Sequence, residues 1–140
     1  MSDGTIFFGT DFSPASDRAF LTALDEAKLR SAELVVAHVI PTVVLLDHGI
    51  GEVAPLRAIC LKKLEALRRR AEAAAVAVRI ELLDGTPHTA LVEAAARANA
   101  ALLVVGTQGR TGVARLVFGS VAMRVVCEAL CPVVVVRAAA

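Results

Sequence analysis

The segment from Gly106 to Ser120 contains the residue types that most often bind phosphate. Gly106 and Gly109 follow an apolar run, and glycine lets a backbone approach a ligand closely and adopt angles that other residues avoid. Gly119 and Ser120 open a predicted helix, whose free N–H groups and positive dipole end favour an anion. The segment therefore predicts an anion site, and the identity of the ligand stays open.

Other interpretations of this segment remain. Glycine-rich loops are common after strands, so these glycines could have a purely structural role. The Walker pattern G-x-x-x-x-G-K-[ST] is absent because no lysine precedes Ser120, and Gly106, Gly109 and Gly112 do not fit the dinucleotide pattern G-x-G-x-x-G. Arg110 could supply positive charge to a ligand or could simply face water.

Further polar residues follow or lie within the predicted strands. In an open parallel sheet, ligands bind beyond the carboxyl ends of the strands, where the strand order reverses. Thr10 and Asp11 follow the first strand, and Asp11 could bind a ligand there or serve only the turn before Pro14. His38 lies within a buried strand, and we interpret it as a hydrogen-bonded histidine in the core or at the edge of a ligand. His88, in the first turn of a helix, is interpreted as a surface capping or packing residue.

Short apolar segments alternate with longer helical segments along the whole chain. Strands are predicted at residues 6–9, 33–39, 76–83, 101–105 and 133–136, and helices at 14–30, about 55–75, 87–98 and 120–130. Several strands are apolar at nearly every position, as is typical of a parallel sheet buried on both faces. Residues 41–54 are predicted to be irregular. The alternation indicates one α/β domain with right-handed crossovers and a doubly wound sheet.

Ser13-Pro14 and Thr86-Pro87 each place a capping hydroxyl before a proline that suits the first turn of a helix. We therefore expect both pairs to mark helix starts, and both hydroxyls to act as caps.

The composition excludes several classes of protein. The 140 residues fit one domain, and 15 basic against 14 acidic side chains argue against a dedicated nucleic-acid binder. No apolar run approaches the roughly 18 residues of a membrane helix, and the N-terminus lacks signal-peptide features, so we expect no membrane association and a cytoplasmic location. The odd number of cysteines (Cys60, Cys127 and Cys131) indicates reduced, core-like thiols.

The spacing Gly106-x2-Gly109-x9-Gly119-Ser120 resembles the signature G-x2-G-x9-G-[ST] of the universal stress protein family. Residues 10–13, 37–40 and 85–88 resemble the first loop, the end of the second strand and the start of the third helix of that family. The resemblance covers essentially the whole chain in the right order. It implies a five-stranded parallel sheet in the order 3-2-1-4-5 with helices on both faces.

The resemblance to ATP-binding members of the family also implies a ligand and its site. Thr10 and Asp11 match positions beside the adenine and ribose, and Val39 matches a position that lines the adenine. A Mg²⁺ ion bridging the phosphates could lie near Asp11. The full set of implied nucleotide-binding residues is Thr10, Asp11, Val39, Val105, Gly106, Gln108, Gly109, Arg110, Gly119, Ser120 and Val121.

We therefore expect an adenine-nucleotide-binding, regulatory or stress-response protein whose cofactor is ATP. A slow ATPase is an alternative, but efficient catalysis is not expected because no lysine or carboxylate pair forms an evident catalytic set. An interaction module without a functional nucleotide is the third alternative. Residues 133–136 are apolar, and the resemblance implies a homodimer through antiparallel pairing of this final strand.

Overall fold

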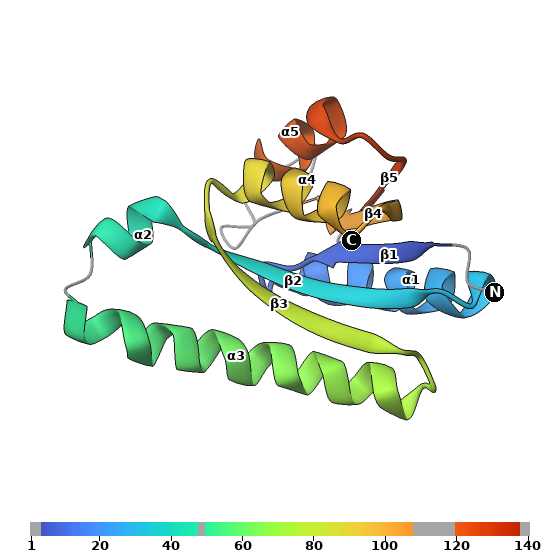
Figure 1. Cartoon of the computed structure of the whole chain (residues 1–140), viewed down its shortest axis with the longest axis horizontal. Coiled ribbons are helices and arrows are strands. Elements are labelled where there is room, and N and C mark those ends of the chain that lie inside the picture. Colours follow the sequence, from blue (N-terminus) through green and yellow to red (C-terminus); the bar gives the residue numbers. More distant parts are fainter. Residues whose placement is uncertain (1–3, 48–49, 108–119, 138–140) are drawn as a thin grey trace.

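The computed structural model describes residues 4–47, 50–107 and 120–137 of the chain (Figure 1). The strands are β1 (Thr5–Gly9), β2 (Glu33–Pro41), β3 (Val78–Gly85), β4 (Ala100–Gly106) and β5 (Val133–Val136). The helices are α1 (Pro14–Arg30), α2 (Thr42–Asp47), α3 (Ile50–Ala73), α4 (Pro87–Arg97) and α5 (Ser120–Glu128). All strand pairs are parallel, and the sheet has the order β3-β2-β1-β4-β5.

This order is the predicted one. Helices cover both faces of the sheet, which confirms the predicted doubly wound fold. Successive side chains of a strand point to opposite faces, so Ile6 and Phe8 pack with α1 and α3, whereas Phe7 packs with α4 and α5. Figure 1 shows α3 running along one side of the sheet and α4 and α5 on the other. All three of these strand residues are fully buried, as expected for a central strand.

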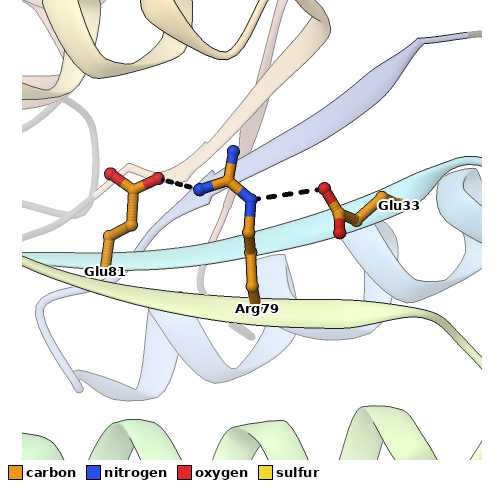
Figure 2. A network of polar contacts seen from close by, with 3 residues as sticks. All are labelled: Glu33, Arg79 and Glu81. Carbon is orange, nitrogen blue, oxygen red and sulfur yellow. Dashed lines mark hydrogen bonds and ion pairs between the residues drawn. The ribbon is translucent and has the colours of Figure 1, made fainter.

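β3 is an edge strand with a mixed pattern. Ile80 packs toward α1 and α3, whereas Arg79 and Glu81 are charged and lie on the other face. Arg79 Nε lies 3.3 Å from a carboxylate oxygen of Glu33 on β2, and the same guanidinium also pairs with Glu81 (Figure 2). Partly exposed ion pairs therefore cover this part of the sheet.

The two predicted helix caps behave differently. The Ser13 hydroxyl accepts a hydrogen bond from the Ser16 N–H at 3.2 Å, as expected for a residue that precedes α1. Thr86 precedes Pro87 in the same way, but its side chain makes no capping hydrogen bond. The expectation of a hydroxyl cap is therefore wrong for α4, whose first turn is closed by the backbone bond from Ala90 N–H to the Thr86 carbonyl at 2.8 Å.

The prediction that residues 41–54 are irregular is wrong, because α2 and the first turns of α3 occupy most of this stretch. Pro55 suggested a helix start but lies inside α3, where a proline lacks the N–H of the helical ladder and its ring crowds the carbonyl of the preceding turn. Val44 of α2 and Leu56 of α3 line a cavity at the end of the sheet. The segment therefore forms helices that line the cavity, despite its local turn signals.

The three cysteines differ in their exposure. Cys60 is buried and Cys131 half-buried, but Cys127 is exposed on α5, so the expectation of core-like thiols is wrong for Cys127. Burial raises the pKa of the Cys131 thiol, which disfavours its reactive thiolate.

Among the helices within the described ranges, none is both long and apolar enough to cross a bilayer.

Candidate functional site

A cavity of about 430 Å³ opens at the carboxyl ends of the strands. Gly9 ends β1, Pro41 ends β2 and Gly106 ends β4, and all three residues line the cavity. β1 lies between β2 and β4, so the sheet grows in opposite directions on either side of it. The cavity therefore occupies the reversal point at which open parallel sheets bind ligands.

The structure brings most of the predicted site residues together around this cavity. Seven of them line it, namely Thr10, Asp11, Val39, Val105, Gly106, Ser120 and Val121. They come from the loop after β1, from β2, from β4 and from the start of α5. The other four predicted residues, Gln108, Gly109, Arg110 and Gly119, lie outside the described residues. Nucleotide binding by the whole set stays a prediction.

Sequence reasoning missed an apolar wall of the cavity. Val44, Leu56 and Cys60 line it from α2 and α3, and Leu91 lines it from α4. Leu56 and Cys60 are four residues apart, so they lie on one face of the helix. Both residues lie within the helix predicted at about 55–75, so this spacing was a signal that could have indicated the wall.

Asp11 closes the turn before α1 and also lines the cavity, so its role toward a ligand stays a prediction. Its Oδ1 accepts hydrogen bonds from the Ser13 N–H at 2.9 Å and from the Ser16 hydroxyl at 2.7 Å. The Asp11 N–H lies 3.2 Å from the Ser16 Oγ. These bonds tie the carboxylate to the first turn of α1, yet Asp11 also lines the cavity. The turn therefore positions an acidic side chain at the edge of the site.

His38 and His88 occupy different surroundings. His38 is buried, lines the cavity and contacts the Thr10 carbonyl oxygen through Nδ1 at 2.7 Å, which confirms the interpretation of a hydrogen-bonded histidine. His88 Nε2 lies 3.4 Å from a carboxylate oxygen of Glu128, so it connects the start of α4 with the end of α5. His88 therefore has a packing role, as expected.

Gly106 is required by packing rather than by an unusual backbone angle. Among the described glycines, only Gly4 and Gly85 have a positive φ, so the expectation of a special angle is wrong for Gly106. A Cβ at this position would lie 3.0 Å from the Ala15 carbonyl carbon and 3.1 Å from the Ser16 nitrogen. A glycine at the end of β4 therefore lets α1 begin directly against the sheet.

The described lining combines a few polar side chains with a mainly apolar surface. Its only charged side chain is Asp11, and its hydroxyl groups belong to Thr10, Ser16, Thr107 and Ser120. The rest is mainly apolar, which suits a flat apolar group held at one end by polar contacts. Within the described residues, no three His, Cys, Asp or Glu side chains gather closely enough to hold a metal ion.

The sequence profile of the universal stress protein family matches residues 4–137 of this chain. A universal stress protein of Methanocaldococcus jannaschii is 36% identical over 137 residues, which cover 94% of this chain and 81% of the relative. A universal stress protein of Thermus aquaticus is 37% identical over 136 residues, which cover 95% of this chain and 98% of the relative.

Solved structures agree with the sequence relatives. The hypothetical protein MJ0577 has a TM-score of 0.88 over 100% of this chain and 99% of its own, at 23% identity, which shows a shared fold. A universal stress protein in complex with cAMP has a TM-score of 0.74 at 30% identity, covering 97% of this chain and 98% of its own. One from Archaeoglobus fulgidus in complex with dAMP has a TM-score of 0.74 at 25% identity, covering 97% and 99%. The family profile and these relatives match nearly the whole length of the chain. This chain therefore belongs to the universal stress protein family.

Proposed function

We propose that this protein binds an adenine nucleotide, ATP, in the cavity at the carboxyl ends of its strands. The observation that carries the proposal is the convergence of seven predicted site residues, from four separate parts of the chain, on one cavity of about 430 Å³. That volume is in the range of small-molecule sites. Two family members of known structure, which bind cAMP and dAMP, support adenine as the base.

Each part of the nucleotide has a matching part of the lining. The apolar wall from Val39 and Leu56 suits the adenine ring, and the Asp11 carboxylate can accept hydrogen bonds from ribose hydroxyls. Ser120 begins α5, a nine-residue helix whose N-terminal N–H groups favour phosphate. Mg²⁺ prefers carboxylate and phosphate oxygens, so with Asp11 on the ribose an ion bound to the phosphates would take its ligands mainly from the nucleotide and water.

The proposed role is regulatory, as a stress-response protein, and not enzymatic. Hydrolysis of ATP needs a positioned water and groups that stabilise the charge on the transferred phosphoryl. Within the described lining, Asp11 is the only charged side chain, and neither lysine nor arginine stands there. Binding without efficient turnover is therefore the function that these residues support best.

The direct test is to denature freshly purified protein and to identify any released nucleotide by chromatography and mass. Calorimetric titration of nucleotide-free protein with ATP, ADP, AMP and cAMP then ranks the ligands. We expect an adenine nucleotide in both experiments. Protein that neither carries nor binds any of the four would overturn the proposal.

A matched pair of carboxylate variants tests the site itself. Asp11→Asn removes the charge at the cavity, whereas Asp84→Asn makes the same change at the end of β3, where Asp84 pairs with Arg57 outside the lining. We expect Asp11→Asn to weaken ATP binding about tenfold, since a hydrogen bond to a charged group contributes about 1.5–3 kcal/mol. Asp84→Asn should leave the Kd within about twofold, and equal effects of the two changes would refute this location for the ribose.

A slow ATPase remains the alternative. Single-turnover measurements with labelled ATP separate the two functions, with Ser120→Ala as the comparison. We expect the two proteins to hydrolyse ATP at the same background rate. Hydrolysis by the unmodified chain well above the rate of Ser120→Ala would favour the enzyme.

A further inference from the structure

His38 is a buried, titratable side chain beside the proposed nucleotide site, and nothing in the proposed function uses it. We infer that His38 is a positioning residue for Asp11, because it contacts the residue on each side of it, at the Thr10 carbonyl and at the Phe12 ring. This inference rests on the proposed function, in which the Asp11 carboxylate binds the ribose.

The first contact is with the residue before Asp11. His38 Nδ1 lies 2.7 Å from the Thr10 carbonyl oxygen, and both residues are buried. A carbonyl oxygen can only accept a hydrogen bond, so Nδ1 must carry the proton. Thr10 therefore selects the Nδ1–H tautomer of the neutral ring, and the ring in turn holds the Thr10 carbonyl.

The second contact is with the residue after Asp11. The rings of Phe12 and His38 have centroids 4.4 Å apart and an interplanar angle of 34°. Phe12 has a φ of 64°, in the left-handed region that side chains rarely adopt. The Phe12 N–H donates to Thr10 Oγ1 at 2.9 Å, and the Lys63 ammonium lies 5.2 Å from the centre of the Phe12 ring. Packing on His38 is thus part of what holds Phe12 in this conformation.

Asp11 is held from two directions as a result. Ser13 and Ser16 of the α1 start fix its carboxylate, and His38 of β2 holds the Thr10 carbonyl before it and packs on the Phe12 ring after it. Without the Nδ1–H, the buried Thr10 carbonyl would lose its ring donor, and an unpaired buried carbonyl favours rearrangement. Such a rearrangement would move the Asp11 carboxylate relative to the ribose.

The test compares ATP with 2′,3′-dideoxy-ATP, which lacks the ribose hydroxyls, by calorimetry on nucleotide-free protein. The unmodified chain should prefer ATP about tenfold, since its carboxylate accepts from those hydroxyls. His38→Leu should lower this preference to about twofold or less. His38→Asn should retain most of it, because the asparagine amide can donate from nearly the position of Nδ1. A merely structural histidine would weaken both ligands equally and leave the preference unchanged.

A double-variant comparison asks whether His38 acts through Asp11. The chain with both His38→Leu and Asp11→Asn should bind ATP within about twofold of Asp11→Asn alone, since coupled residues do not add. Additive losses, or an unchanged preference in His38→Leu, would overturn the inference and leave the proposed function standing. Failure of the unmodified chain to bind ATP would instead remove the proposed function and this inference together.

A measurement on the unmodified chain avoids any dependence on how the variants fold. The ¹⁵N chemical shifts of an imidazole distinguish its two neutral tautomers, and His38→Asn assigns the signal. We expect His38 to be the Nδ1–H tautomer at neutral pH. A neutral ring protonated on Nε2 would contradict the inference.

Discussion

At the scale of single residues, two glycines show how packing at the carboxyl ends of the strands constrains the choice of side chain. A Cβ on Gly106 would meet the backbone of α1, which cannot move without moving the helix. A Cβ on Gly9 would lie 2.8 Å from the Leu91 Cδ1, at a side chain that lines the cavity. The Leu91 side chain can rotate into the cavity to avoid a Cβ on Gly9, whereas the α1 backbone cannot easily move away from a Cβ on Gly106.

Gly106→Ala should therefore destabilise the protein by about 1–3 kcal/mol, the usual cost of overpacking. Gly9→Ala should cost less stability but weaken ATP binding, because Leu91 moves into the cavity. Urea unfolding and calorimetric titration of both variants check this. Equal losses of stability, or unchanged ATP binding by Gly9→Ala, would contradict the argument.

At the scale of the elements, α1 and α4 begin with the same kind of pair and are stabilised differently. α1 depends on the Ser13 hydroxyl, which accepts from the Ser16 N–H, and the Ser13 N–H also donates to Asp11. α4 follows Thr86 without a side-chain cap. The start of α1 therefore contributes both to stability and to the geometry of the site.

Ser13→Ala should lower the free energy of unfolding by about 1 kcal/mol, the typical value of a side-chain cap. Thr86→Ala is the matched control, and its effect should stay within about 0.5 kcal/mol, as for a surface change. Chemical denaturation of the two variants gives both values. A loss in Ser13→Ala that also stays within about 0.5 kcal/mol would mean that the hydroxyl cap does not stabilise α1.

At the scale of the whole molecule, the two edges of the sheet differ. The β3 edge carries Arg79 and Glu81, and charged side chains protect an edge strand from pairing with another chain. β5, at the other edge, consists of four half-buried valines. This contrast supports the predicted homodimer through β5, which stays a prediction.

Val135→Pro is the sharpest test of that dimer. The Pro132 carbonyl accepts a hydrogen bond from the Leu103 N–H of β4, and the Val136 carbonyl accepts one from the Thr107 N–H. Because the backbone groups of successive residues point to opposite sides of a strand, the N–H of Val135 points away from β4. The variant removes a donor from the free edge while leaving the pairing with β4. Light scattering should then report a monomer for Val135→Pro and a dimer for the control Arg79→Ala. A dimer in both, or a monomeric unmodified chain, would reject pairing through β5.

Local sequence signals determined most elements and their order. Ser13 and Pro14 mark the start of α1, and the predicted range 14–30 is the observed one. Strands buried on both faces are apolar at nearly every position, so the doubly wound sheet was also predictable, and the family resemblance supplied the strand order. The residues that follow the strands, such as Thr10 and Asp11, could be predicted as candidate site residues because parallel strands bring their carboxyl ends together.

Only the tertiary structure decided which distant residues meet at the site. Glycines and Pro55 indicated a break after β2, yet helices form there, and Leu56 and Cys60 on α3 complete the cavity wall. Likewise, the bond from His38 to Thr10 joins residues 28 positions apart, and Gly106 is explained by its contact with α1. Helix periodicity and caps act within a few residues, whereas these contacts depend on how separate elements pack. The sequence by itself therefore determined the scaffold and the edge of the sheet where we propose that a ligand binds, and packing determined the walls of the cavity and the support of Asp11.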